Sequence, residues 1–456
     1  MSTRTVLPCV LALTALVTAL ALTVRSGGTL AHHTLLYAWY ALDAALFALA
    51  VLLLRRVPGR PVVPLVLAGS LAVAAVGLLA PPRTSDDAYR YVWDGRVQAA
   101  GVSPYDYPPD APALAGLRDP GLFPADDACT GWDERRTAAG DCTRINRPAV
   151  RTVYPPVAEA WFLAVHPFGG GVRGVQVAGA VLALATTGAL LLLGRGHRRA
   201  ALWGWCPGLA VWSVNDAHVD TLGALLMVAG LGCVARRRSA VGGALVGLAV
   251  ATKLLPALAL PGALSGLLRS RPTGRQPRHG LLVAGSAFAA FAAAYLPYAA
   301  VSGAGVLGYL PGYLREEGYG QERVDRFGLL RLVLPAGLTP WAAALLLAAV
   351  VLWVLRRGDP ARPWSGALLV TGAALLLVAP GYPWYGLLVV ALVALDGRWE
   401  WLAVPAAGQV LYLTGGGWAQ QIAYGAALAC VLAGGLLRSR GVRCAEVPRV
   451  RPVLPP

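Results

Sequence analysis

The stretch TLLYAWYALDAALFALAVLLLRRVPGRPVVPLVLAGSLAVAAVGLLA, at residues 34–80, consists of two long apolar runs separated by an arginine-rich break. Each run has the length that an α-helix needs to cross the hydrocarbon core of a bilayer, about 20 residues. The break, RRVPGR at 55–60, is typical of a short connection in water. The stretch therefore predicts two consecutive membrane-spanning helices, at 34–54 and 61–80.

Similar runs recur along the whole chain of 456 residues. Apolar residues make up 57% of the sequence and charged residues 14%, whereas soluble globular proteins have about 45–50% and about 25%. We therefore predict an all-α, polytopic membrane protein of about 14 helices (range about 11–14) that forms a single domain over 1–456. The predicted spans are 6–24, 34–54, 61–80, 173–193, 200–214, 219–234, 240–252, 254–268, 280–300, 338–355, 363–379, 384–396, 401–414 and 419–437.

The chain has 39 basic and 23 acidic residues, which gives a net charge of +16. In a soluble protein such an excess would suggest a nucleic-acid partner. Here 23 arginines, with only four acidic residues, lie in termini and short connections that the predicted spans place on one side of the membrane. The positive-inside rule makes that side cytoplasmic. We expect a multi-pass cell-membrane protein with both termini in the cytoplasm and no nucleic-acid partner.

Two larger connections are left for the external side. Loop 81–155 carries nine arginines and eleven acidic residues, and loop 301–331 carries four of each. Long loops among short ones are typically binding or catalytic elements, so we expect the catalytic loop at 81–155. Residues 156–168 are apolar but short, and we interpret them as a half-helix in the outer leaflet. Cys129 and Cys142 could form a disulfide in the external loop, or remain free thiols.

The stretch SDDAYRYVWD, at 85–94, follows the third predicted span. Adjacent carboxyls at a membrane surface repel each other and lose hydration, which raises the pKa of one of them and suits it to accept a proton. Asp86 and Asp87 are therefore candidate catalytic residues, and a helix would place Asp94 on the same face as Asp87. An ordinary interfacial helix with a Ser-Asp cap is the alternative. Paired carboxylates also suit a divalent metal ion, and that question stays open.

Basic residues in two other motifs could bind a lipid phosphate. Arg151 lies in RINRPAVRTVYPP, at 144–156, just before Tyr154, and a guanidinium can hold a phosphate with two hydrogen bonds. Lys253, in ATKLLP, is the only lysine of the chain, and its compact ammonium could meet a phosphate at the external surface. Long basic side chains that merely reach the lipid headgroups are the alternative for each.

Polar and aromatic residues mark two further external turns. In NDAHVD, at 215–220, His218 and Asp220 are ionisable groups at membrane depth, where they are costly unless they have a function; helix capping is the alternative. Trp384 and Tyr385 belong to YPWY and could stack on a sugar, although an interfacial aromatic belt is the simpler interpretation.

The order of these motifs is familiar. SDDAYRYVWDGRVQAAGVSPY, INRP, VYPPVAEAWF, WCPG with NDAHVD, ATKLLP and YPWY together resemble the polyprenol-phosphate-sugar-dependent membrane glycosyltransferases of the GT-C class. More narrowly, the chain resembles the bacterial alpha-mannosyltransferases and related enzymes grouped as glycosyltransferase family 87 or DUF2029. The resemblance covers about 86–385 and is weakest in loop 301–331, where it gives little information on the acceptor.

The resemblance implies a GT-C-like fold whose large external first loop contains short interfacial helices. It also implies a role for each matching residue. Asp86 would be the catalytic base, with Asp87 as second carboxylate. The phosphate of the donor would be bound by Lys253, Arg90 and Arg151. The sugar or acceptor would be contacted by Asp94, Tyr154, His218, Asp220, Trp384 and Tyr385.

The function implied is transfer of a sugar, in the first place mannose, from a polyprenyl-phosphate donor to an envelope glycan, glycolipid or glycoprotein on the external face. Membrane lipids would be the other partners, and no cofactor beyond the undecided metal ion is implied. An arabinosyltransferase, or a transferase of another lipid-linked sugar, is an alternative. A lipid-linked-sugar flippase is a further one, although it would need polar groups across the membrane depth, whereas here they gather at one rim.

Overall fold

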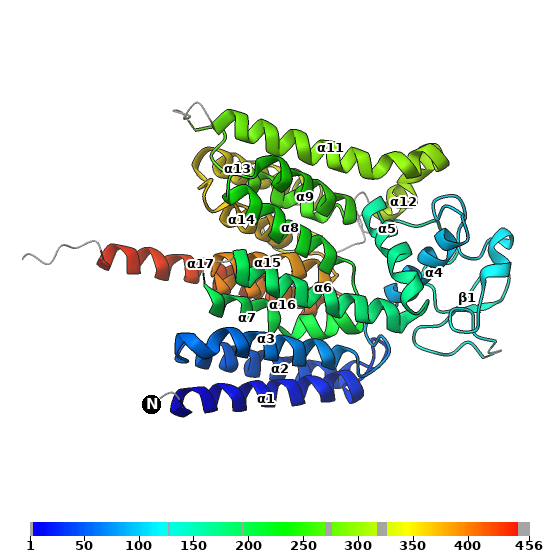
Figure 1. Ribbon diagram of the computed structural model, residues 1–456, viewed down its shortest axis with the longest axis horizontal. Coiled ribbons are helices and arrows are strands. Elements are labelled where there is room, and N and C mark those ends of the chain that lie inside the picture. Colours follow the sequence, from blue (N-terminus) through cyan, green and yellow to red (C-terminus); the bar gives the residue numbers. More distant parts are fainter. Residues whose placement is uncertain (1–2, 126–127, 194–195, 270–275, 317–325, 446–456) are drawn as a thin grey trace, which may run out of the picture.

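The computed structural model describes residues 3–125, 128–193, 196–269, 276–316 and 326–445. In these parts of the chain almost every element is a helix (Figure 1). The one sheet among them pairs β1 (Arg135–Arg136) with β2 (Cys142–Thr143), two residues each. The predicted all-α fold is therefore confirmed.

Within the described part of the chain, seven helices are long and apolar enough to cross a membrane. Each coincides with a predicted span to within a few residues, apart from longer ends on α11 and α17. They are α1 (Thr3–Ser26), α2 (Thr34–Leu54), α3 (Gly59–Gly77), α6 (Val172–Leu193), α11 (Gln276–Ser302), α13 (Thr339–Arg357) and α17 (Trp418–Ala445).

The other predicted spans fall on shorter or broken helices. The shorter helices are α8 (Asp220–Ala235), α9 (Ser239–Thr252), α14 (Pro363–Val378), α15 (Gly386–Asp396) and α16 (Ala403–Thr414). The predicted span 200–214 is split into α7 (Ala201–Gly204) and a π-helix, Leu209–Asn215, which meets α8 at an angle of 109°. The predicted span 254–268 contains only a 3-10 turn and α10 (Leu260–Ala263).

Prolines explain why these two predicted spans are not continuous helices. Pro207 lies between α7 and the π-helix, while Pro256 and Pro261 lie within the second segment. A proline has no N–H to donate and collides with the preceding turn, so an apolar run that contains it need not form one straight helix. The sequence pattern of about 14 spans thus corresponds to seven long helices, or eight with the bent pair as one span, and several short ones.

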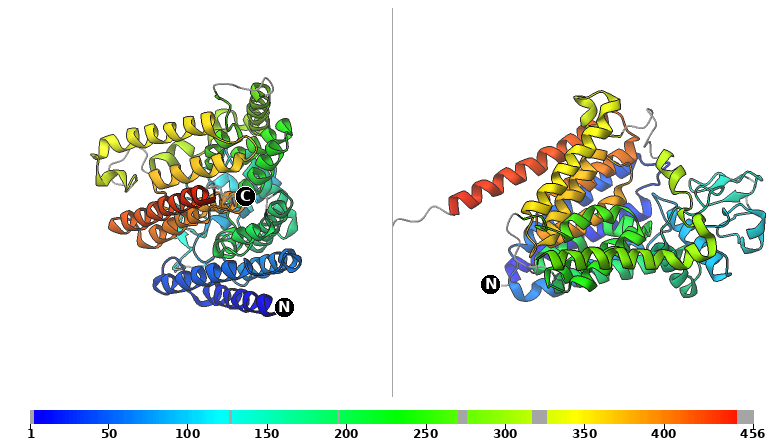
Figure 2. Two further views of the ribbon diagram at one scale, coloured as in Figure 1. Left: turned by 90° about the vertical axis from the view of Figure 1, so that its left-hand side faces the viewer. Right: turned by 90° about the horizontal axis from the view of Figure 1, so that it is seen from above.

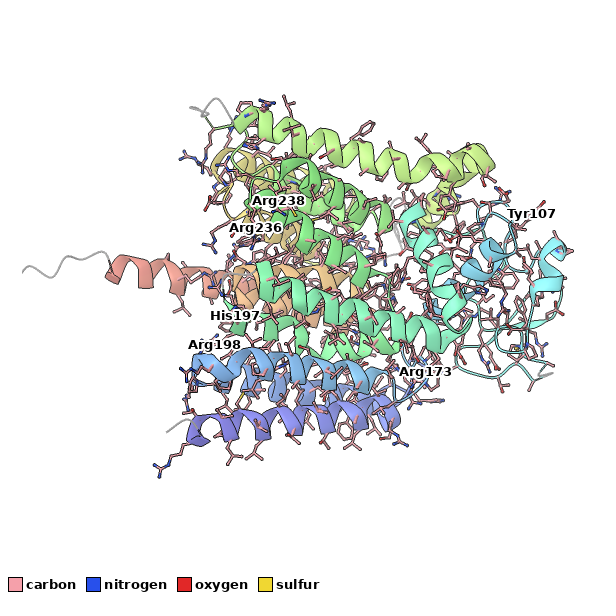
Figure 3. The ribbon with its side chains drawn as sticks, viewed as in Figure 1. Tyr107, Arg173, His197, Arg198, Arg236 and Arg238 are labelled. Carbon is pink, nitrogen blue, oxygen red and sulfur yellow. A yellow bond between two sulfur atoms is a disulfide. The ribbon has the colours of Figure 1, made fainter. Side chains whose placement is uncertain are left out.

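The polar loop and the arginine-rich connections lie at opposite ends of the helix bundle. α4 (Asp87–Ala99), α5 (Pro156–Val165) and β1 form one end, which we call the loop end (Figure 1). Tyr107 is at the loop end, whereas Arg198 and Arg236 are at the other (Figure 3). The additional views agree that α17 leads away from the loop end (Figure 2).

The loop end has its own folded structure. The predicted disulfide between Cys129 and Cys142 is present. α5 packs against α4, since Tyr91 stacks on Phe162 with the ring centroids 4.4 Å apart. With ten residues, α5 is not among the candidate spans. The loop end is therefore a compact cap on the bundle, stabilised by a disulfide and a small aromatic core.

Within the bundle, α9 and α11 approach each other at glycines. A Cβ atom at Gly243 would lie 2.3 Å from the carbonyl oxygen of Val283, and one at Gly247 would lie 2.1 Å from that of Ala287. Small residues four positions apart allow such close approach of membrane helices. These contacts hold α9 in place, and Lys253 follows directly at its C-terminal end.

We predict that Gly247→Leu lowers the thermal unfolding temperature of the detergent-solubilised protein. The side chain would force α9 away from α11, and overpacking of this kind costs about 1–3 kcal/mol. Gly285→Leu on α11 is the matched control, because nothing lies within 4 Å of a Cβ atom there. Equal unfolding temperatures for the two variants would contradict the packing described.

Candidate active site

The first catalytic candidates follow a turn that two buried side chains hold in place. The amide of Asn215 donates to the carbonyl oxygens of Gly77, Ala80 and Pro81 at 2.9–3.1 Å. The carboxylate of Asp216 accepts from the backbone N–H groups of Arg83 and Thr84, both at 3.1 Å. It also accepts from the Thr84 hydroxyl.

These bonds decide where the chain goes after α3. Asn215 and Asp216 are 1% and 0% exposed, and their bonds to the segment 77–84 link it to the bend between the π-helix and α8. Asp86 and Asp87 come directly after this anchored segment, and Asp87 begins α4. The first half of the NDAHVD motif is therefore structural, but it anchors the segment 77–84 and does not cap α8, which has no side-chain cap hydrogen bond at its start.

The loop end contains a cavity of about 720 Å³. Its wall combines acidic, basic and aromatic side chains from segments far apart in sequence. The polar and aromatic residues that line it are Ser85, Asp86, Asp87, Arg90, Arg135, Asn146, Arg147, Arg151, Tyr154, Lys253, Tyr309, Tyr313, Arg326, Tyr382, Trp384, Tyr385 and Tyr412. A concave site with a few convergent polar groups is the usual form of a substrate pocket.

The two carboxylates are joined by one amide. Nδ2 of Asn146 donates to Oδ1 of Asp86 at 3.0 Å and to Oδ1 of Asp87 at 2.6 Å. Arg135 forms an ion pair with the other oxygen of Asp86. Nδ1 of His218 lies 3.4 Å from Oδ2 of Asp87, which is a longer contact than a well-formed hydrogen bond.

These surroundings push the pKa values of the two carboxyls apart. Burial, together with the charge of Asp87, raises the pKa of Asp86 in spite of Arg135. Burial also opposes ionisation of Asp87, but His218 and the charge of Lys253 lower its pKa to about 2. Asp87 thus stays ionised, whereas Asp86 has the higher proton affinity of the two and is the better proton acceptor.

Two cations of the cavity wall are held by buried acids behind them. Nε of Arg90 donates to Asp94 at 2.9 Å, while Nη2 of Arg90 is buried without a hydrogen-bond partner in the part of the chain described. Nζ of Lys253 lies 2.6 Å from Oδ2 of Asp220 and 4.7 Å from the ring centroid of Tyr385. A buried donor without a partner is unusual, so Arg90 is a candidate for binding a ligand at this wall of the cavity.

Aromatic rings form a further part of the cavity wall. Trp384 lies between Tyr382 and His218, with ring centroids 4.9 Å and 3.8 Å away. The short segment between α14 and α15 carries both aromatic residues, so the C-terminal half of the chain completes the cavity. Flat aromatic faces next to charged groups are well suited to a sugar, whose C–H faces stack on rings while its hydroxyls bond to polar groups.

The structure brings most of the predicted site residues together. Those that line the cavity are Asp86, Asp87, Arg90, Arg151, Tyr154, Lys253, Trp384 and Tyr385. Asp94, His218 and Asp220, which we expected to contact sugar or acceptor, do not line it. They are buried behind Arg90, Asp87 and Lys253 respectively. Their contacts are with other site residues.

Sequence reasoning missed several lining residues. Asn146 lies in the RINRP motif, where only the arginines seemed informative, and its amide joins the two carboxylates. The segment 301–331 contributes α12 (Leu310–Glu316), and the hydroxyl of Tyr313 lies 2.6 Å from that of Tyr385. Residues 317–325 of that predicted loop lie outside the described part of the chain.

The carboxylate pair does not fit a divalent metal ion. Each of the four carboxylate oxygens already faces a nitrogen. One oxygen of each carboxylate faces the amide of Asn146, the other oxygen of Asp86 faces Arg135, and the other oxygen of Asp87 faces His218. Hard cations need several oxygen ligands that are free to face them. Among the described residues, the one other candidate group of metal ligands contains Cys129 and Cys142, which are joined in the disulfide. No step of the reaction below is assigned to a metal.

Comparison with known proteins gives one match. No curated protein and no solved structure matches the chain. A family model described as "Alpha-(1->6)-mannopyranosyltransferase, N-terminal domain" matches residues 11–269, which is more than half of the chain and includes the carboxylate pair and Lys253. The match confirms the resemblance to mannosyltransferases that the motifs suggested. The chain therefore belongs to the alpha-(1->6)-mannopyranosyltransferase family of mannosyltransferases.

Proposed function

We propose that this mannosyltransferase takes mannose from a polyprenyl-phosphate donor and transfers it to a hydroxyl of a glycan, glycolipid or glycoprotein. The observation that supports this proposal is the set of side chains that line one cavity. A carboxyl of raised pKa, Asp86, shares it with the cations of Arg90 and Lys253, and Arg90 has an unused buried donor. Transfer from a lipid phosphate needs a proton acceptor for the attacking hydroxyl and cations for the leaving phosphate.

In the proposed reaction, the oxygen of the acceptor hydroxyl bonds to the anomeric carbon of mannose. Asp86 accepts the proton that this hydroxyl loses. The bond from that carbon to the phosphate oxygen breaks, and its electron pair leaves with the polyprenyl phosphate. Arg90 and Lys253 stabilise the charge that develops on the phosphate. Asp87 remains ionised and, through Asn146, keeps Asp86 in place.

The arrangement of the charges supports an active site on the external face of the cell membrane. The arginine-rich connections are at the end of the bundle opposite the cavity (Figure 3). By the positive-inside rule that end is cytoplasmic, together with both termini. A lipid carrier is then the natural donor, because it brings the activated sugar to the face on which the cavity opens. We propose that the whole chain, 1–456, acts as one catalytic domain, with 81–155 as its main external loop.

The donor class can be tested directly with the purified protein in detergent or nanodiscs. We expect product from polyprenyl-phosphate mannose and an oligomannoside acceptor, and no product from a nucleotide-linked mannose. Product from polyprenyl-phosphate arabinose alone would change the sugar assigned to the enzyme. Product from the nucleotide sugar would overturn the proposed donor.

We predict that Asp86→Asn lowers kcat about 10²–10⁴-fold, since general base catalysis contributes about that much. The protein should still fold, because Asn keeps the size of the side chain. Asp106→Asn is the matched control: it removes the same charge from the same loop, but Asp106 does not line the cavity. Near wild-type kcat for Asp86→Asn would remove Asp86 from the mechanism.

Lys253→Ala should raise the apparent KM for the polyprenyl-phosphate donor about tenfold to a hundredfold, the worth of a hydrogen bond between charged groups. Arg136→Ala removes an exposed cation of the same loop end that does not line the cavity, and it should leave KM unchanged. Steady-state kinetics with varied donor concentration measure both. An unchanged KM for Lys253→Ala would leave Lys253 with a structural role only.

A further inference from the structure

A pair of carboxyl groups is buried next to Arg90, on the side away from the cavity. Asp94, on α4, is 1% exposed and Glu159, on α5, is 0% exposed. Asp94 forms the ion pair with Arg90 and also a hydrogen bond with Glu159. Two carboxyls can share a hydrogen bond only if one of them carries a proton.

Apart from Asp94 and Arg90, the described polar neighbours of Glu159 are neutral. The hydroxyl of Thr152 donates to Oε1 of Glu159 at 2.6 Å, and Nε2 of Gln98 donates to Oε2 at 2.9 Å. The hydroxyl of Tyr298, on α11, donates a hydrogen bond to Oε1 of Gln98 at 2.8 Å and so fixes the orientation of that amide. The nearby charges are therefore those of Asp94 and Arg90, which gives two carboxyls for one guanidinium.

Electrostatics favours the proton on Glu159. Burial raises the pKa of both carboxyls, but Arg90 counteracts this effect most strongly at Asp94. At Glu159 the charge of Asp94 adds to the effect of burial and raises the pKa further. Glu159 is thus the proton donor of the pair, and Asp94 is the ionised acceptor that also binds Arg90.

The protonation state decides the charge that a phosphate would meet. With one ionised carboxyl, the group of Arg90, Asp94 and Glu159 is neutral overall, and Nη2 of Arg90, a residue of the cavity wall, has no hydrogen-bond partner among the described residues. With both carboxyls ionised the group would carry one negative charge, which would repel a phosphate across a poorly screened interior. A phosphate site at Arg90 therefore requires that one proton stays in the pair.

We propose that protonated Glu159 donates a hydrogen bond to ionised Asp94, and that this pair positions the guanidinium of Arg90 at the cavity wall for the phosphate of the lipid donor. Asp94 and Glu159 are then positioning residues that act through Arg90 and do not touch the substrate. Their role rests on the proposed function, because it presupposes a phosphate in the cavity.

The test compares two substitutions, each of which replaces an acid by the amide of the same size. Glu159→Gln replaces a neutral acid by a neutral amide of equal size that can still donate to Asp94. Asp94→Asn removes the charge that faces Arg90. Binding of polyprenyl monophosphate to the detergent-solubilised protein, and KM and kcat with polyprenyl-phosphate mannose, are measured together with the unfolding temperature.

We expect Glu159→Gln to keep phosphate affinity and KM within about threefold of wild type. Asp94→Asn removes a negative charge near the phosphate, but it also removes the ion pair that holds the guanidinium of Arg90. We expect the loss of positioning to dominate, so that both weaken about tenfold or more with a smaller change in kcat. Equal losses in the two variants, or wild-type affinity in Asp94→Asn, would overturn the proposal.

Glu159→Gln is decisive even where Asp94→Asn does not fold. If Glu159 were ionised in the wild type, its replacement by Gln would remove a negative charge near Arg90 and tighten phosphate binding about tenfold or more. That result would contradict a protonated Glu159. If the proposed function itself is wrong, the wild-type protein will not bind polyprenyl monophosphate. That result is distinct from any difference between the two variants.

Discussion

The site depends on the carboxylate of Asp216, which is fully buried and accepts hydrogen bonds from the backbone of Arg83 and Thr84 and from the Thr84 hydroxyl. Hydrogen bonds to an ionised acceptor are about twice as strong as neutral ones. These bonds attach Arg83 and Thr84, in the segment that follows α3, to the bend that precedes α8. Because the carboxylate pair begins two residues later, this attachment sets the distance between Asp86 and the cations of the cavity.

The same bend supplies the support for two further site residues. His218 lies beside Asp87 and stacks on Trp384, and Asp220 pairs with Lys253. The candidate site therefore has two layers: groups that line the cavity, and buried partners that fix their charge and orientation. Arg90 follows the same plan, with Asp94 behind it. In enzymes such supporting layers keep reactive groups in position, which stabilises the transition state without reorganisation.

Much of the fold follows from the sequence, because hydrophobic length is a strong signal in a membrane protein. The predicted span 34–54 matches α2 at both ends. Local signals were less informative where proline interrupts an apolar run, as at Pro207. The sequence identified site residues where the residue type is unusual for its surroundings, as with Lys253, the only lysine of the chain. Asn146 was missed because an amide in a polar loop is unremarkable until the fold places it between two carboxylates.

In the proposed mechanism the carboxylate pair and the cations converge on one lipid phosphate. An experimental structure of the protein in nanodiscs with polyprenyl monophosphate tests this arrangement. We expect phosphate density next to the guanidinium of Arg90 and close to Nζ of Lys253, with Asp86 facing the space next to it. Phosphate bound at the arginine-rich end of the bundle, or outside the cavity at the loop end, would contradict this arrangement.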